Sequence, residues 1–363
     1  MRTSFFAGVS ILALGIASAS ADESATTNQR GTEGGAYINQ ANDTDDATAI
    51  IRQGETGTGD VAATYQDGTG RARAVVNQNT GGTEGGDNLA GIVQTDGTGS
   101  AGSIAGSRAV LTQDGSSNTG GIRQQGTGNL GFLTQDGSAN QAVVKQGDAR
   151  NETFEILNAS VPSAEEDWQE LNFDFDEEKV SGHSRDTPPG GIDGFPDPDP
   201  EGIVTDSTGD IYQYGEGSKA AILQVTGDYH EAFIEQLDDG NEARALQAGY
   251  SQYASIVQEG QNNGADVRQQ NGEGSGNHTA EILQSGDLNT ILLDQTGTEN
   301  ASFFRQEGSE NSAMVVQMGE YDITRVNQRG DGNSAEVYQE NDDIHSTAIV
   351  RQSGGENTSV INQ

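Results

Sequence analysis

The composition of this chain limits the folds and partners that it can have. Of its 363 residues 32% are apolar and 51 are glycine, none is cysteine, and the formal net charge is −38. Disulfide bonds and thiolate chemistry are therefore excluded, and nucleic acid and anionic membranes are disfavoured as partners because their phosphates would repel the chain. So few apolar residues can fill only a thin core, which requires a repeated backbone pattern.

The first 21 residues have the layout of a secretory signal peptide. Arg2 supplies a positive start, residues 5–17 form a short apolar run, and Ala19-Ser20-Ala21 is a small-residue cleavage site. No later segment approaches the length of a membrane span, so we expect no membrane anchor. The segment 22–35, between the signal peptide and the first repeat, is predicted to be flexible.

Short units that end in glutamine recur over residues 36–158 and 207–363, mostly 11 residues apart. Most units carry a large apolar residue two positions before this glutamine and a small residue four positions before it. Asparagine is frequent six positions before the glutamine, and glycine is the commonest residue two positions after it. One further unit ends in Asn158. Because these positions alternate, their side chains share one face of a strand, and the glycine and asparagine lie in turns.

A unit of one strand and one turn cannot bury its own apolar stripe, whereas stacked units can. We therefore predict an all-β fold, a two-sheet parallel β-solenoid of strand–turn–strand repeats of 22 residues. Glutamine would stack on glutamine and asparagine on asparagine in hydrogen-bonded ladders. The intervening residues, among them Arg123, Lys145 and Arg305, are expected to face outward. The last repeat ends on Gln363, which predicts an edge open to another chain.

The predicted self-assembly site consists of the inward amides of these ladders. Its glutamines are Gln113, Gln124, Gln135, Gln146, Gln224, Gln236, Gln258, Gln295, Gln306, Gln317, Gln328, Gln339 and Gln363. Its asparagines are Asn118, Asn129, Asn140, Asn289, Asn300, Asn311 and Asn333. The four histidines are scattered and match no zinc motif, and no nucleophile motif appears. We expect no catalytic residues, no cofactor and no metal.

Residues 159–206 interrupt the repeats with an acidic segment that holds all six prolines and the single tryptophan, Trp168. Residues 164–180 could form a short helix, and the proline-rich part should be irregular. Three interpretations remain open. The segment is a solvated loop that leaves one continuous solenoid, a docking segment with aromatic residues set among acids, or a Ca²⁺-binding loop built on Asp193, Asp197 and Asp199.

The unit Ala-x-Val-x-Gln-x-Gly-x-x-Asn resembles the curlin repeat of curli fibre subunits. The stretches NASFFRQEGSENSAMVVQMG and NTGGIRQQGTGNLGFLTQDGSANQAVVKQG carry it closely, and the resemblance covers most of residues 36–158 and 207–363. It implies a subunit that leaves a Gram-negative-type bacterium through a dedicated outer-membrane pore and polymerises into cross-β fibres. This chain departs from the usual curlin pattern in having more repeats, a more acidic composition and a long interruption.

The resemblance implies that the partners are further copies of the chain, other curli-type subunits and the outer-membrane export pore. We therefore expect a secreted, non-enzymatic subunit of extracellular amyloid fibres that supports biofilm matrix and adhesion. The alternative is a soluble, monomeric β-solenoid that acts as an adhesin or a Ca²⁺-binding module. The repeat of eleven residues, without a recurring GGxGxD signature, differs from the nonapeptide Ca²⁺-binding repeat.

Overall fold

The structure is a computed structural model that describes thirteen ranges of the chain. These are residues 24–29, 35–40, 47–54, 60–67, 71–79, 88–95, 106–147, 153–157, 168–172, 204–225, 227–271, 276–340 and 345–363. The predicted signal peptide, residues 1–21, lies outside them, as do Asp193, Asp197 and Asp199. The described ranges contain β-strands and turns, and no helix that could cross a membrane.

Two 12-stranded sheets form the body of the molecule, and the chain alternates between them. Sheet 1 contains β1 (Ser24–Gln29), β3 (Thr48–Gln53), β5 (Arg73–Asn79), β7 (Arg108–Ser116), β9 (Leu130–Ser138), β14 (Thr208–Glu216), β17 (Glu231–Leu237), β19 (Tyr253–Glu259), β21 (Thr279–Ser285), β23 (Ala301–Glu307), β25 (Ile323–Arg329) and β27 (Thr347–Ser353). Sheet 2 contains β2 (Gly35–Gln40), β4 (Val61–Asp67), β6 (Leu89–Thr95), β8 (Thr119–Gln125), β10 (Gln141–Gln146), β15 (Lys219–Gln224), β18 (Glu242–Ala248), β20 (Gly264–Asn271), β22 (Thr290–Gly297), β24 (Ser312–Gln317), β26 (Ser334–Gln339) and β28 (Thr358–Asn362).

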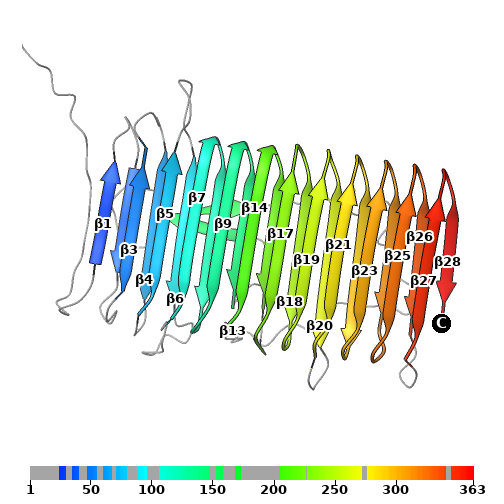
Figure 1. Ribbon diagram of the computed structural model, residues 1–363. Helices are drawn as coiled ribbons and strands as arrows, with labels where there is room; N and C mark the ends of the chain where they lie inside the picture. The colour runs from blue at the N-terminus through cyan, green and yellow to red at the C-terminus, as the bar shows by residue number, and fades with distance from the viewer. Residues whose placement is uncertain are drawn as a thin grey trace, which may run out of the picture.

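All pairings within the two sheets are parallel and in register, which confirms the predicted β-solenoid. In β23 and β25, for example, Phe304 pairs with Val326 and Gln306 with Gln328. The two repeat arrays form one continuous body, because β9 pairs directly with β14 and β10 with β15 across the interruption. Figure 1 shows the strands as one unbroken row with β1 and β28 at opposite ends.

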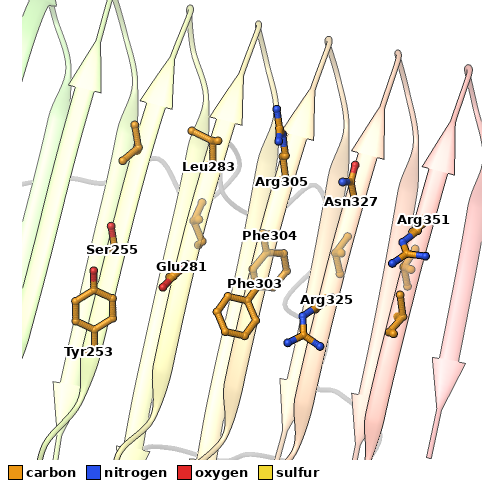
Figure 2. Close-up of a pocket in the computed structure, with 15 residues that line it drawn as sticks. Tyr253, Ser255, Glu281, Leu283, Phe303, Phe304, Arg305, Arg325, Asn327 and Arg351 are labelled. Carbon is orange, nitrogen blue, oxygen red and sulfur yellow. The ribbon is translucent and has the colours of Figure 1, made fainter.

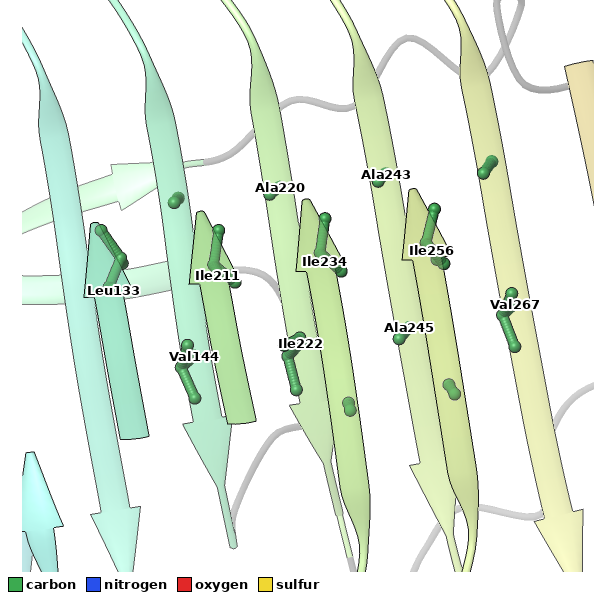
Figure 3. Close-up of a cluster of buried hydrophobic side chains, with 14 of the residues drawn as sticks. Leu133, Val144, Ile211, Ala220, Ile222, Ile234, Ala243, Ala245, Ile256 and Val267 are labelled. Carbon is green, nitrogen blue, oxygen red and sulfur yellow. The ribbon is translucent and has the colours of Figure 1, made fainter. Parts of the chain in front are cut away.

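The core is a thin apolar layer between the two sheets, as the alternation predicted. Strand burial alternates along most strands, and the large residue two positions before the glutamine is buried throughout most of the solenoid. Figure 3 shows Leu133, Ile211, Ile234 and Ile256 along one sheet, opposite Val144, Ile222 and Val267 along the other. Small residues fit between them: a Cβ on Gly131 would lie 2.8 Å from Cγ2 of Ile122 in the other sheet. The small position thus keeps the sheets close.

Three local predictions are wrong. Segment 22–35 is not wholly flexible, because Ser24–Gln29 form β1, which pairs with β3 in register from Ser24–Thr48 to Gln29–Gln53. The unit that ends in Asn158 is not a rung, because β11 (Thr153–Leu157) pairs antiparallel with β12 (Trp168–Asn172) outside both large sheets. The helix suggested for residues 164–180 is replaced at 168–172 by β12; the neighbouring residues lie outside the described ranges.

The outer face of sheet 2 is partly covered. Strand β11 contacts β6 and β8. Lys145, on the neighbouring strand β10, occupies an outward position as predicted, yet its side chain is buried. A second short parallel pair, β13 (Val204–Thr205) with β16 (Gly227–Asp228), lies beside the re-entry into the second array. Outward position in a strand therefore does not guarantee exposure in this protein.

Candidate self-assembly site: the buried amide ladders

The inward glutamines form one continuous hydrogen-bonded ladder in each sheet. In sheet 1 Nε2 of Gln258 donates to Oε1 of Gln284 at 2.8 Å, and Gln284 donates in the same way to Gln306 at 3.0 Å. The sheet 1 ladder joins Gln53, Gln78, Gln113, Gln135, Gln213, Gln236, Gln258, Gln284, Gln306, Gln328 and Gln352. The sheet 2 ladder joins Gln40, Gln66, Gln94, Gln124, Gln146, Gln224, Gln247, Gln269, Gln295, Gln317, Gln339 and Gln363.

All these bonds point the same way, with Nε2 donating toward the β27–β28 end. The thirteen predicted glutamines all belong to the ladders, and all of them except Gln363 are buried. Gln363 follows the last strand and is exposed, and its Oε1 accepts from Gln339 at 3.2 Å. The ladders therefore have a direction: one end of the solenoid presents amide acceptors and the other presents amide donors.

Most ladder amides also connect the two sheets, which the sequence did not predict. Besides its ladder bond, Nε2 of Gln258 donates to the backbone carbonyl of Glu242 in sheet 2 at 3.1 Å. Gln306 donates likewise to Thr290, and in the reverse direction Gln269 donates from sheet 2 to Tyr253 in sheet 1. The glutamine amide is thus saturated in two perpendicular directions. A buried amide that is fully bonded avoids the desolvation cost of unpaired polar atoms.

The asparagine ladder runs along the turns that lead into sheet 2. Oδ1 of Asn289 accepts both the backbone N–H of Asn311 at 3.1 Å and its Nδ2 at 3.0 Å. Nδ2 of Asn311 also donates to the carbonyl of Gly330, one rung further, at 2.7 Å. Asn333 repeats the pattern on Asn311, and the backbone N–H of Asn140 bonds to Oδ1 of Asn118. The predicted stacking of asparagine on asparagine is therefore confirmed in this row of turns, except where Asp60 and Ser218 take the place of asparagine.

The other row of turns, which leads into sheet 1, is chemically mixed. From β9 to β27 its buried positions are Asn129, Ser207, His230, Gln252, His278, Asn300, Asp322 and Ser346. Asn129 and Asn300 lie in this row, so the prediction that they stack on asparagine is wrong. At several of these positions the next backbone N–H still finds an acceptor: Asn300 N–H donates to Nδ1 of His278, and Asp322 N–H to Oδ1 of Asn300. At His230 and Gln252 the corresponding atoms, Nδ1 and Oε1, accept no hydrogen bond from the described residues. Where the bond forms, the site requires a buried acceptor, which histidine, serine or aspartate can also supply.

His278 occupies such a turn position as a neutral imidazole. Its Nδ1 accepts from the backbone N–H of Asn300 at 3.2 Å, so its Nε2 carries the proton and donates to the carbonyl of Gln270 at 3.1 Å. Burial disfavours the charged form and lowers the pKa of His278 from 6.5 to about 4. A protonated ring could no longer accept from Asn300.

The solenoid is expected to lose stability around His278 as the pH falls. Below pH 6.5 the unfolded chain takes up a proton that the folded ring refuses until about pH 4. Stability is therefore fully present above pH 6.5, declines between 6.5 and 4, and falls by up to about 3 kcal/mol. Hydrogen exchange of the amides around His278, compared at pH 7 and pH 4.5 after correction for the intrinsic exchange rate, should show a smaller pH effect in His278→Asn, because Asn300 shows that asparagine fits this position. Equal pH effects in both proteins would contradict the assigned neutral ring.

Ionisable groups also gather on the outer face of sheet 2. Asp266 is buried beside Arg244 at 2.6 Å and Arg268 at 2.9 Å. Burial raises the pKa of Asp266, but the two guanidinium groups lower it by more, so this pKa lies below its ordinary value. Burial raises the pKa of Asp294, one strand further, to about 6. These residues form a row of charges across β18, β20 and β22. Within the described residues no group of three or more His, Asp or Glu is placed to hold a metal ion.

The fold and the ladders define the class of protein: a parallel β-solenoid of strand–turn repeats stacked through buried glutamine and asparagine. The family model for the curlin associated repeat matches residues 205–237 and 286–319. The first match spans β14, β15 and β17, and the second spans β22, β23 and β24. No curated protein matches the chain. The two matches support the assignment of the chain to the curlin-repeat family.

Proposed function

We propose that this protein is a secreted structural subunit of curli-like amyloid fibres, which assemble by stacking one solenoid on the end of the next. The curlin associated repeat and the β-solenoid fold fit such a subunit. The observation that carries the proposal is the ladder itself. Each internal step of a ladder consists of the same backbone pairing and the same amide bond, so a step between two chains can repeat it.

The direction of the ladders supports head-to-tail stacking. At the β27–β28 end Oε1 of Gln363 accepts from Gln339, which leaves its Nε2 to donate along the sheet 2 ladder, whereas Nε2 of Gln352 already donates to the carbonyls of Ser334 and Asn357. At the other end Gln40 offers its Oε1 acceptor. Donors meet acceptors only when the β27–β28 end of one chain contacts the β1–β2 end of another. Two like ends would bring donor against donor or acceptor against acceptor. A polar fibre with all chains in one orientation follows from this geometry.

The partners and the location are proposed together with the fibre. The chain would bind further copies of itself and other curli-type subunits, and an outer-membrane pore would export it to the cell surface. There the fibres would contribute to biofilm matrix and adhesion. The role is structural and not catalytic. The net charge of −38 would keep single chains dispersed through mutual repulsion before they assemble.

A substitution at the outer edge of β28 tests the stacking. Gln363 uses its N–H and its carbonyl to pair with sheet 2, so by the alternation of a parallel strand the backbone N–H of Val360 faces the open edge. Val360→Pro removes this donor and leaves the bonds to β26 intact. We expect Val360→Pro chains, added at one tenth of the total, to slow the elongation of wild-type fibres, because a bound variant ends growth at its β28 edge.

Dye-binding kinetics and fibre diffraction provide the measurements. Wild-type chains should give fibres with a reflection near 4.7 Å, and Val360→Ala, which keeps the N–H, should elongate as the wild type does. Two results would reject the proposal. The first is elongation of pure Val360→Pro at the wild-type rate. The second is a purified wild-type chain that stays monomeric, which would favour a soluble adhesin or, if calorimetry shows stoichiometric Ca²⁺ binding, a Ca²⁺-binding module.

A further inference from the structure

A groove of about 620 Å³ lies on the outer face of sheet 1 across β19, β21, β23, β25 and β27. Figure 2 shows its lining, with Phe303 near the centre, Leu283 on the neighbouring strand β21, and Arg325 and Arg351 on the next two strands in the other direction, β25 and β27. Leu283 and Ile349 are 36% and 48% exposed, although both are large apolar residues. The groove therefore combines exposed apolar surface with guanidinium groups on adjacent rungs.

The charge of the groove is opposite to that of the chain. The outward positions of β21, β23, β25 and β27 carry Arg305, Arg325, Arg329 and Arg351, and their only acidic residues are Glu281 and Glu307. Four positive and two negative groups leave these four strands at +2, and Glu259 on β19 lowers the five-strand face to +1, whereas the whole chain is at −38. Four of the 18 basic residues are thus concentrated on a few neighbouring strands.

Two of these arginines lack a carboxylate partner in the described part of the chain. Arg305 and Arg329 both pair with Glu307, the latter at 2.6 Å. Arg325 instead lies over the ring of Phe303, with Cζ 5.2 Å from the ring centroid. Arg351 is exposed and also lines the groove. Arg325 and Arg351 can therefore receive carboxylates from outside the chain, and the Phe303 ring holds the Arg325 guanidinium in place.

We propose that this groove binds the acidic–aromatic segment 173–178 of a second copy of the chain. Its sequence, Phe-Asp-Phe-Asp-Glu-Glu, sets two aromatic residues among four acids. The acids are complementary to Arg325 and Arg351, and the aromatic rings are complementary to Leu283, Phe303 and Ile349. Such a contact joins solenoids side by side, which goes beyond end-to-end stacking and does not depend on it.

The lengths and positions fit this occupant. Five parallel strands span four spacings of about 4.8 Å, or roughly 19 Å, and six extended residues reach about 20 Å. Within one chain the segment follows β12, whose partner β11 contacts β6 and β8 of sheet 2. The groove lies on the other sheet and on later rungs. The segment of a neighbouring solenoid is therefore the better-placed occupant.

A peptide-binding assay on the monomeric full chain tests the inference without requiring fibres. A fluorescent peptide of residues 172–179 should bind saturably, and more weakly as NaCl is raised. Arg325→Glu combined with Arg351→Glu should weaken binding at least about tenfold, because like charges then face each other. The matched control is Arg108→Glu, since Arg108 lies over Phe132 at 5.4 Å on the same face of sheet 1 but outside the groove. It should change the affinity less than about twofold.

Three results would overturn the inference. The first is equal binding of a peptide in which Asp174, Asp176, Glu177 and Glu178 are replaced by their amides. The second is an equal loss in the Arg108→Glu control. The third is binding of polygalacturonate, but not of the peptide, in an Arg325-dependent manner, which would assign the groove to an anionic polysaccharide. Circular dichroism verifies folding, and the pair Arg325→Gln and Arg351→Gln replaces the glutamates if that variant does not fold.

Discussion

Replacing Gln258 by alanine is expected to destabilise the solenoid by about 3–6 kcal/mol, concentrated in the rungs that contain β17, β19 and β21. The substitution removes three hydrogen-bond partners at once. It leaves Oε1 of Gln284 without its ladder donor, one N–H of Gln236 without an acceptor, and the carbonyl of Glu242 with one bond fewer, all in a dry interior; Gln236 keeps its bond to the carbonyl of Lys219. Each orphaned buried group costs about 1–3 kcal/mol, and a cavity adds to this loss.

Two further variants separate hydrogen bonding from packing. Gln258→Met keeps most of the side-chain volume but lacks the amide. It should therefore destabilise the solenoid almost as much as Gln258→Ala does. Val257→Ala, on the outward side of the same strand, should cost less than about 1 kcal/mol. Hydrogen exchange is the appropriate measurement, because stability in a repeat protein is a sum over neighbouring units and a single unfolding midpoint is not well defined. Equal protection in the Gln258→Ala and Val257→Ala proteins would show that the ladder contributes little.

Gly330→Ala is expected to be far more damaging than Gly332→Ala, although both lie in one turn. Gly330 has φ of 106°, and a Cβ there would lie 2.1 Å from the carbonyl oxygen of Gly354 in the next rung. The turn cannot relax without separating the rungs, so we expect a loss of about 3 kcal/mol or more. Gly332 has φ of 66°, and its Cβ would come no closer than 3.7 Å to Glu356, so alanine should cost about 1 kcal/mol.

The hydrogen bond from the N–H of Gly354 to the carbonyl of Arg329, 3.0 Å long, reports on this clash directly. Exchange of the Gly354 amide should accelerate in Gly330→Ala and remain nearly unchanged in Gly332→Ala. The same substitution should slow fibre formation, since misaligned rungs cannot offer a regular edge to an incoming chain. Similar exchange in the two variants would mean that the turns of successive rungs are not in close contact.

Much of the fold follows from the repeat because strand alternation and turn chemistry are local. The period of two assigns Gln258, Ile256 and Ala254 to the interior, and all three are buried. The glycines predicted in the turns, among them Gly115 and Gly308, adopt positive φ. The same local rule failed where one position deviates. Strand β1 was missed because Thr27 replaces the large apolar residue, and the Asn158 unit was accepted although Phe154 occupies the position reserved for a small residue.

The sequence predicted the hydrogen bonds of the candidate site that run along the solenoid, but not those that join the two sheets. Stacking of identical residues along the solenoid follows from the repeat length, so the Gln306–Gln328 bond could be foreseen. The bond from Gln306 to the Thr290 carbonyl could not, because it depends on how the two sheets face each other. The mixed turn row was missed for a related reason. His278 and Asp322 share no residue type with Asn300, and only the common backbone N–H that each accepts reveals their equivalence.

The sequence by itself determined the strand faces, the turns, the parallel stacking and the inward glutamine ladder, because each of these depends on residues within one or two repeat units. The tertiary structure decided the rest. It joined the arrays across the interruption, buried Lys145, bonded most ladder glutamines to the opposite sheet, and placed Phe303, Arg325 and Ile349 in one groove. These contacts link residues that are a full turn or more apart in the chain. Distances of that kind are set by the packing of complete rungs, which no local pattern contains.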